Sequence, residues 1–418
     1  MTADRPVHPV RLAALLALLA MFGPFAIDAF FPAFHAIAVD FGASDWAMQQ
    51  TISVYLIAYA VMSLFHGPLA DALGRRRVVL AGVLLYTAAS IWCALAGSIG
   101  ELLAARALQG VSTGAGLIVG RAIVRDLYHG PEAQKVMALI TLFFGVAPAI
   151  APVIGGLVYQ ASGWRAVFWF LAVYGLLLYA LCWRSLPETH PPAARMPMAF
   201  APLARVYATQ VRDLRFGLLA VATGLNFGAS FLYISSAPAF IERILGLGPL
   251  GHPWFFVPMI AGMMTGATLS NRLAGRLAPR RTVQLGYAIM AVAGALNLGY
   301  NGLVDAPSVP WAVLPMGLNA VGIALGFPTL SIKMLDRYPH NRGAASSMQA
   351  FLWGVVTSGI AGLLSPLLSA SAWHLALGAV TMTALGWACW RGYAAITPVP
   401  AEPLGDLPDD GPQAPVAT

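Results

Sequence analysis

The stretch HGPLADALGRRRVVLAG, from His66 to Gly82, decides the fold class of this chain. It places one acid, Asp71, and three consecutive arginines, Arg75 to Arg77, between two long apolar runs. The whole chain is 59% hydrophobic and only 10% charged, with a mean hydropathy of +0.73, whereas soluble domains carry roughly 25% charged residues. A bundle embedded in lipid needs far fewer charges, because lipid rather than water covers most of its surface. The stretch is therefore interpreted as a short polar loop between two membrane spans.

Runs of roughly 20 apolar residues, the length that crosses a bilayer, recur along the chain. They predict an all-α integral membrane protein of twelve transmembrane helices in two six-helix lobes. The first run is too long for the apolar part of a signal peptide, so we expect it to be an uncleaved span. The predicted spans are 12–35, 46–69, 78–98, 101–123, 134–158, 165–185, 214–240, 252–275, 281–301, 309–333, 344–369 and 373–394. The predicted domains are a cytoplasmic N-terminus (1–11), an N-terminal lobe (12–185), a Pro-rich cytoplasmic linker (186–213), a C-terminal lobe (214–394) and a disordered cytoplasmic tail (395–418).

The positive charges alternate with these spans. Of the 24 Lys and Arg residues, 21 fall in loops on one side, Arg165 and Arg243 fall on the other side, and Arg106 lies within a span. Since loops rich in Lys and Arg stay in the cytoplasm, both termini are predicted to be cytoplasmic. The net charge of +7 is distributed between spans, which argues against nucleic acid as a partner.

A weak internal repeat supports the two lobes. The segment LADALGRRRVVLAG from Leu69 aligns with LAGRLAPRRTVQLG from Leu273, about half a chain later, with Gly275 in the place of Asp71. Both segments join the second and third predicted helices of a lobe. Parallel repeats of this kind are typical of two-lobed transporters.

The opening stretch resembles the loop signature of the major facilitator superfamily. More closely, residues 12–394 are similar to drug:proton antiporters of the bicyclomycin-resistance (Bcr/CflA) type. The resemblance implies a conformational latch that joins the lobes on the cytoplasmic side; the alternative is that the arginines only fix the topology. Glycines allow close helix packing or a tight turn, and the acid can cap a facing helix or pair with an arginine. The residues of the expected latch are Gly67, Asp71, Gly74, Arg75, Arg76 and Arg77.

A second motif, Arg106, Gln109 and Gly110 in the fourth span, resembles the RxxQG signature of the same antiporters. Arg106 lies about 8 Å inside the span at 1.5 Å per residue. A charge at this depth is costly, and it indicates a functional site. The alternative is an arginine that snorkels to the nearer surface.

Asp28 lies about 10 Å inside the first span by the same rise, and with Pro32 it matches the D-x-x-x-P pattern of the family. Burial favours the protonated acid, whereas a nearby Arg106 favours the carboxylate. We therefore predict that Asp28 and Arg106 form the proton-coupling site; the alternative is a fixed structural ion pair. The family usually has tyrosine where Phe30 stands.

The fifth span carries Pro148, Pro152, Gly155 and Gly156, which resemble the antiporter signature, although Ala151 stands where many antiporters have glycine. Proline removes a backbone hydrogen bond, and glycine lets helices approach closely. The same residues would also suit ordinary helix packing.

The resemblance implies that the first, fourth, seventh and tenth helices line a central cavity. An aromatic pocket with few polar groups suits amphipathic ligands. The candidate substrate contacts are Phe31, Tyr55, Asn226, Phe231, Tyr233 and Trp353.

Other chemistry finds no support in the sequence. Ser112 matches a G-x-S-x-G pattern, but it lies in an apolar helix where small residues serve packing. We see no phosphate-binding loop, no ligand-spaced His pair and no metal-binding Cys spacing. We expect no enzyme activity, no metal and no cofactor.

The predicted function is proton-coupled efflux of small amphipathic compounds, such as antibiotics, by a monomer whose partners are substrate, protons and lipid. Two alternatives remain: a proton-coupled uptake carrier on the same fold, and a membrane sensor that does not transport.

Overall fold

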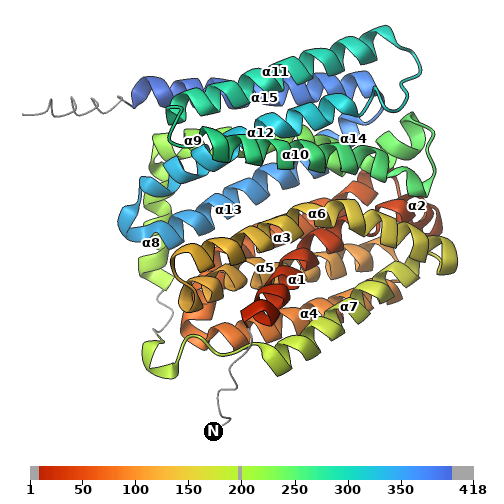
Figure 1. Ribbon diagram of the computed structural model, residues 1–418. Helices are drawn as coiled ribbons and strands as arrows, with labels where there is room; N and C mark the ends of the chain where they lie inside the picture. Colours follow the sequence, from red (N-terminus) through yellow and green to blue (C-terminus); the bar gives the residue numbers. More distant parts are fainter. Residues whose placement is uncertain (1–8, 196–199, 398–418) are drawn as a thin grey trace, which may run out of the picture.

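The computed structural model describes residues 9–195 and 200–397, and all regular elements within these ranges are helical (Figure 1). The N-terminal lobe consists of α1 (Pro9–Asp28), η1 (Phe31–Ala33), α2 (Phe34–Phe41), α3 (Asp45–Leu73), α4 (Arg75–Leu95), α5 (Ile99–Leu127), α6 (Gly130–Ser162) and α7 (Trp164–Ser185). The C-terminal lobe consists of α9 (Leu214–Ser235), η3 (Pro238–Ile244), η4 (Pro249–Gly251), α10 (Pro253–Leu273), α11 (Pro279–Leu303), α12 (Leu314–Asp336), η5 (Pro339–Asn341), α13 (Arg342–Gly359), η6 (Ile360–Leu364), α14 (Ser365–Leu368) and α15 (Ala372–Ile396).

Most of these helices are long and apolar enough to cross a membrane. Within the described ranges, eleven single helices or continuous helix runs qualify, and a twelfth qualifies if η3 and the segment Pro249–Leu273, bent by 118°, count as one span. Large apolar side chains such as Leu177, Val292 and Leu367 are more than half exposed. Such a surface is costly in water but favourable in lipid, which agrees with the predicted membrane bundle.

The two lobes lie one above the other in Figure 1, and α3 and α13 run side by side between them. The hydroxyl oxygens of Ser53 and Ser358 lie 2.9 Å apart across this interface. A methyl group added to Gly354 would come within 2.6 Å of the Ala60 side chain. Small residues thus bring the lobes into close contact.

The helix bundle has two ends, which are named here because the site is described relative to them. We call the end where α1 begins and α15 ends the terminal end, and the opposite end, with α2 and α14, the distal end (Figure 1). At the distal end, Arg243 of η3 pairs with Asp45 of α3 at 2.7 Å. The Gln50 amide also donates to the Gly362 carbonyl at 2.9 Å. Both contacts join one lobe to the other.

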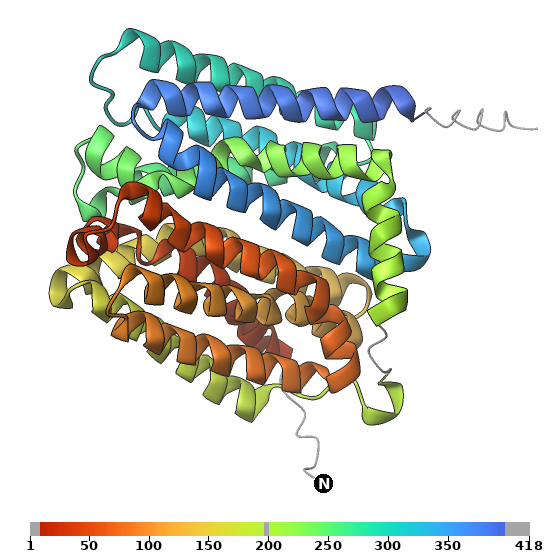
Figure 2. The same ribbon diagram turned by 180° about the vertical axis from the view of Figure 1, so that it is seen from behind.

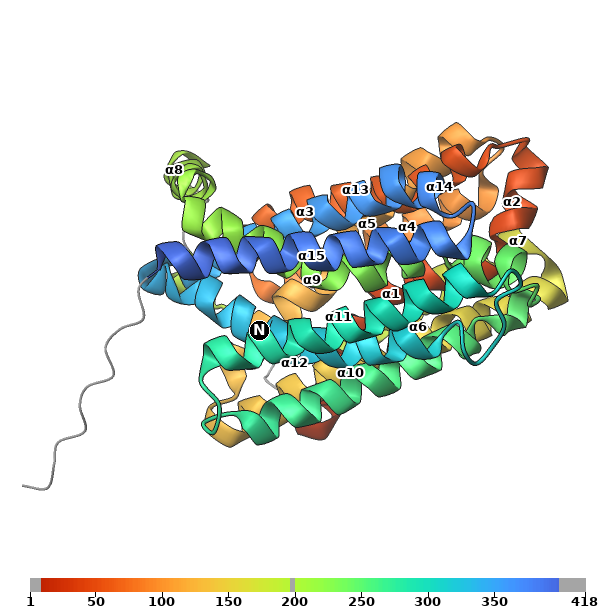
Figure 3. The same ribbon diagram turned by 90° about the horizontal axis from the view of Figure 1, so that it is seen from above.

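The linker contains a helix that the sequence analysis did not assign. After η2 (Pro192–Ala194), it forms α8 (Phe200–Arg212), which lies across the terminal end, roughly perpendicular to the bundle (Figures 2 and 3). The Tyr207 hydroxyl donates to the Leu64 carbonyl of α3 at 2.8 Å, and Gln210 is fully buried. These tertiary contacts stabilise a helix that composition alone does not indicate. The predictions for residues 1–8 and for the tail from 398 lie outside the described residues.

Candidate functional site

The first span breaks at Asp28. Pro32 stands four residues later and has no N–H, so the Asp28 carbonyl cannot receive the usual helical hydrogen bond. Helix α1 accordingly ends at Asp28, and the short helix η1 follows with Pro32 in its first turn. The D-x-x-x-P spacing therefore places Asp28 at a helix end within the first candidate span.

Arg106 is fully buried and is held by uncharged groups. Its guanidinium donates to the Ala26 carbonyl at 2.7 Å and to the Thr51 carbonyl at 3.2 Å. The rings of Phe30 and Tyr55 lie 4.6 and 4.7 Å from its central carbon, within cation–π distance. The snorkelling alternative is therefore wrong for this structure, because the charge stays inside the lobe.

The other motif residues of α5, Gln109 and Gly110, have two different roles around Arg106. Gln109 accepts from the guanidinium at 2.7 Å and donates to the Ser90 hydroxyl at 2.8 Å, which fixes the orientation of its amide. A methyl group on Gly110 would come within 2.1 Å of the Tyr55 carbonyl, so only glycine allows this crossing of α5 and α3. The spacing of the RxxQG pattern thus combines an acceptor for Arg106 with the close approach of a neighbouring helix.

Asp28 is 3% exposed, and its Oδ1 has no hydrogen-bond partner among the described residues. Within the same residues, no ion pair within 4.0 Å joins Asp28 to Arg106, so the fixed ion pair is not formed in this structure. The carbonyls of Ala26 and Thr51 take its place around the arginine. Thr51 and the ring of Phe30 are site residues that the sequence analysis did not assign; no sequence signal marks a backbone carbonyl.

The glycines of the fifth span contact two different partners. A methyl group on Gly155 would lie 1.7 Å from the Ala29 carbonyl, directly after Asp28. A methyl group on Gly156 would lie 3.0 Å from the Leu250 side chain in the other lobe. Helix α6 is continuous and contains both Pro148 and Pro152. The motif therefore packs α6 against the break at Asp28 and against the C-terminal lobe.

The expected latch is built around Arg75. This residue is 8% exposed and pairs with Asp71 at 2.5 Å and with Asp126 at 3.2 Å, while its backbone N–H donates to Glu188 at 2.9 Å. Gly74 has φ +100°, and a methyl group there would come within 2.4 Å of the Glu188 carboxylate. The predicted tight turn at Gly74 is thus confirmed, as is the predicted pairing of Asp71 with an arginine.

The repeat has a structural counterpart. Arg76 donates to the Trp183 carbonyl in the last turn of α7 at 2.6 Å, and Arg280, its equivalent in the second copy, donates to the Ala394 carbonyl in the last turn of α15 at 3.2 Å. Carbonyls at a helix C-terminus lack intrahelical donors and attract positive charge. Each copy therefore fixes the last helix of its lobe. At Gly275, φ is +75° and α10 has already ended at Leu273.

One expectation about the latch is not met. A methyl group on Gly67 would meet nothing within 4 Å, so the missing side chain at this position does not allow a close helix contact in this structure. The Asp71 side chain is 49% exposed, and Arg77 is exposed as well. All contacts given above for the latch arginines lie within the N-terminal lobe or the start of the linker. The joining of the two lobes by this cluster stays a prediction.

The candidate substrate contacts fall into three groups. Phe231 and Trp353 lie 6.5 Å apart between ring centroids in one aromatic cluster. Tyr55 belongs to the Arg106 site, and Phe31 is buried against Phe30. The other two candidates are buried within the C-terminal lobe: Asn226 beside Met290, and Tyr233 between Phe240 and Phe255.

A buried carboxyl group like that of Asp28 can bind and release a proton as its surroundings change. Among the described residues, no group of three His, Cys, Asp or Glu side chains could hold a metal ion.

The sequence matches the Major Facilitator Superfamily over residues 15–362. The chain belongs to this superfamily.

Several relatives agree with this membership. The chain is 30% identical to an uncharacterized transporter of the superfamily, YdgK of Bacillus subtilis, over 85% of this chain and 89% of that one. It is 28% identical to a bicyclomycin resistance protein homolog of Haemophilus influenzae, over 80% and 83%. It is 29% identical to a chloramphenicol resistance protein of Pseudomonas aeruginosa, over 90% of each chain. The predicted likeness to bicyclomycin-resistance transporters is confirmed.

Solved structures show the same fold. The crystal structure of a D-xylose–proton symporter superposes with a TM-score of 0.71 at 14% identity, covering 90% of this chain and 97% of that one. At this identity the likeness concerns the fold alone. The protein is thus a transporter of the superfamily, and the direction of transport must be argued from its site.

Proposed function

We propose that this protein exports small amphipathic compounds, antibiotics among them, across a bacterial inner membrane in exchange for protons. Transport proceeds by alternating access, in which the cavity between the lobes opens to one side of the membrane at a time. Asp28 carries the proton, and Arg106 sets its electrostatic surroundings. No resident cofactor takes part in this scheme.

The observation that carries the proposal is the contrast between the two buried charges. Arg106 obtains its hydrogen bonds from Ala26, Thr51 and Gln109, and it contacts two aromatic rings. The remaining guanidinium nitrogen, Nη2, is buried without a hydrogen-bond partner among the described residues, and no ion pair within 4.0 Å joins Arg106 to Asp28. The Asp28 carboxyl, buried with an unpartnered oxygen, is free to change between its neutral and charged forms as its access to water changes.

The coupling of proton and substrate movement follows from the change of charge at Asp28. With the cavity open to the periplasm, Asp28 takes up a proton; with the cavity open to the cytoplasm, it loses the proton and substrate binds. Proton and substrate then favour different states of the same lobes, and differential binding is what shifts a conformational equilibrium. Because α6 packs on the carbonyl that follows Asp28, movement between α1 and α6 would change the surroundings of the acid.

The names of the relatives support export of antibiotics. Two of the relatives described above are named for resistance to bicyclomycin and to chloramphenicol. The excess of Lys and Arg on one side of the spans supports a cytoplasmic position for the terminal end. On this orientation, Asp71 and Arg75 to Arg77 lie at the cytoplasmic mouth, where the latch would join the lobes when that mouth closes.

The direct test replaces Asp28 by asparagine, which has a similar size but takes up no proton. In an efflux-deficient host, Asp28→Asn is expected to abolish resistance to bicyclomycin and chloramphenicol conferred by the wild type, while membrane insertion is unchanged. In proteoliposomes, it should abolish substrate movement driven by a pH gradient. Asp305→Asn, at an exposed loop position between α11 and α12, is the matched control. Wild-type efflux by the Asp28→Asn variant would refute the assignment.

A proton-coupled uptake carrier is the second candidate, since the fold is shared with a D-xylose–proton symporter. The two functions predict opposite effects of the same gradient. If the outside of a vesicle is made acidic, an antiporter oriented as in the cell depletes substrate from the interior, whereas a symporter accumulates it. Measuring the direction of flux therefore decides between them.

A further inference from the structure

Helix α8 is too short to be a membrane span. It has 13 residues, whereas a helix needs about 20 to cross a bilayer. Figure 2 shows α8 roughly perpendicular to the long helices, and Figure 3 shows it end-on, beside the bundle and level with the helix ends at the terminal end. Since the long helices cross the membrane, α8 lies along the membrane surface.

One face of α8 packs against the bundle. Its members recur at the three- and four-residue spacing of a helix face: Leu203, Val206 and Tyr207 are partly buried, and Gln210 is fully buried. The Tyr207 hydroxyl donates to the Leu64 carbonyl of α3 at 2.8 Å. This packed face fixes how α8 is rotated, so its other side chains point away from the bundle.

The strip of α8 next to the packed face is apolar and uncovered. Phe200 and Val211 are both 63% exposed, and Ala204 is exposed as well. At 3.6 residues per turn, these three positions fall within about 40° of one another around the helix. Leu214 and Val221, on the helix that follows, are exposed too. The apolar surface therefore continues along the chain from α8 into a span, as it does on a helix that touches lipid.

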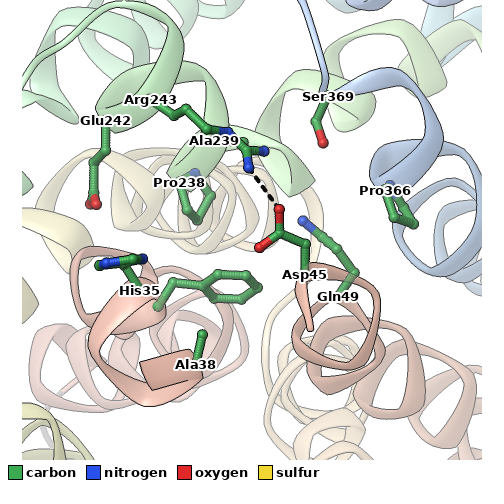
Figure 4. Close-up of a pocket in the computed structure, with 11 residues that line it drawn as sticks. His35, Ala38, Asp45, Gln49, Pro238, Ala239, Glu242, Arg243, Pro366 and Ser369 are labelled. Atoms are coloured by element: carbon green, nitrogen blue, oxygen red, sulfur yellow. Dashed lines mark hydrogen bonds and ion pairs between the residues drawn. The ribbon is translucent and has the colours of Figure 1, made fainter. Parts of the chain in front are cut away.

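The outermost face of α8 carries two arginines. Arg205 and Arg212 are exposed, and seven residues place them on nearly the same side of the helix, about 10 Å apart along its axis. At the distal end, by contrast, the exposed Arg243 has an acidic partner, Asp45, at 2.7 Å (Figure 4). Within residues 9–195 and 200–397, no ion pair engages Arg205 or Arg212. Both guanidinium groups are available to an anion outside the protein.

The order of these faces is that of a helix at a membrane interface. In such a helix, apolar side chains reach the boundary of the acyl chains, and basic side chains lie among the headgroups. A guanidinium group also binds phosphate through two parallel N–H donors and keeps its charge. Two arginines beside an apolar strip thus match a phospholipid whose headgroup has a net negative charge.

We propose that α8 binds anionic phospholipids in the leaflet at the terminal end. Arg205 and Arg212 contact the phosphate groups, while Phe200 and Val211 lie among the first methylene groups of the acyl chains. Because α8 connects the two lobes along the chain and holds α3 through Tyr207, bound lipid keeps the linker at the membrane surface as the lobes move. This surface lies outside the cavity between the lobes, and its lipid contacts depend neither on the direction of transport nor on proton coupling.

The test measures lipid retention by native mass spectrometry. The purified full-length protein is delipidated in detergent and titrated with dioleoylphosphatidylglycerol or with dioleoylphosphatidylcholine, whose headgroup has no net charge. The wild type is expected to bind phosphatidylglycerol at least tenfold more tightly than phosphatidylcholine. Arg205→Gln combined with Arg212→Gln should weaken phosphatidylglycerol binding roughly tenfold or more, because each basic side chain at an anionic lipid surface contributes a factor of about five.

Three further variants separate the site from the general positive charge of this end. Arg272→Gln combined with Arg276→Gln removes two exposed charges at the end of α10 and in the loop that follows, and it should leave the affinity within twofold of the wild type. Lysine at both α8 positions keeps the charge and should retain most of the affinity. Phe200→Ser removes an apolar contact and should weaken binding with the arginines intact.

Several results would overturn the proposal. They are wild-type binding of phosphatidylglycerol by the α8 glutamine pair, an equal loss in the control pair at α10, and equal binding of the two lipids by the wild type. Displacement of the lipid by inorganic phosphate would also overturn it, since that result indicates a site for a soluble anion. If the glutamine pair is not monodisperse, Phe200→Ser carries the same comparison. The measurement requires no proton gradient, so a failure of the proposed antiport leaves its interpretation unchanged.

Discussion

Gly155 offers the sharpest test of how the fold supports the proton site. A methyl group at this position would lie 1.7 Å from the Ala29 carbonyl oxygen, whereas contacts of an added Cβ below 3.0 Å are essentially never tolerated. The obstacle is backbone, so no side chain can rotate away. For Gly155→Ala, α1 and α6 must separate by about 1.7 Å or more to regain an ordinary van der Waals distance of about 3.4 Å.

The energetic cost follows from this separation. Overpacking of this kind costs about 1–3 kcal/mol, and the gain in helix propensity from glycine to alanine, about 0.5–1 kcal/mol, offsets part of it. Gly145 lies on the same helix, and a methyl group there would meet nothing within 4 Å. Gly145→Ala should therefore leave stability unchanged or raise it slightly, which makes it the matched control.

The assay has two parts. Unfolding of the purified variants by titration with sodium dodecyl sulfate should show Gly155→Ala to be less stable than Gly145→Ala by about 1–3 kcal/mol. Efflux from cells should fall in Gly155→Ala beyond any change in the amount of protein, because the displaced carbonyl adjoins Asp28. If Gly155→Ala matches Gly145→Ala in both stability and efflux, the inferred role of the α1–α6 contact is wrong.

Two further predictions concern single charges. Arg106→Lys should reduce transport at least tenfold, while membrane insertion is unchanged. The reason is that one ammonium group cannot reproduce the several donors of the guanidinium to Ala26, Thr51 and Gln109. Transport at the wild-type rate would contradict this prediction. Asp213 lies in the loop before α9, where its burial raises the pKa but its hydrogen bond and ion pair with Arg337 lower it more, so that the pKa lies below its usual range. Asp213→Asn should therefore lower the free energy of unfolding by about 1.5–3 kcal/mol at neutral pH. The difference from the wild type should shrink as the pH falls below about 4, the pKa of the carboxyl in the unfolded chain, and should be lost below the lowered pKa of the folded state, where the wild-type carboxylate is protonated. A difference that grows on acidification would contradict the assignment.

The sequence predicted the elements of this fold well because its signals are local. A run of apolar residues long enough to cross a bilayer has few alternatives to a helix, since backbone hydrogen bonds in lipid must be made within the chain. The break of the first span at Asp28 differs from the prediction of one continuous span over 12–35, although its cause is also local: Pro32 removes the donor for one particular carbonyl. The exception is α8, whose Tyr207 and Gln210 are ordered by contacts with distant residues.

The sequence by itself determined which polar residues fall within the apolar helices and how they are spaced along each helix, because the rise per residue and the D-x-x-x-P and RxxQG spacings are fixed. Only the tertiary structure decided which groups they meet. It gave Arg106 two carbonyls from other helices in place of Asp28, set Gly155 against the Ala29 carbonyl, and left Gly67 without a neighbour. The physical reason is that contacts between helices depend on how they cross and pack, and no spacing within one helix encodes the backbone of another.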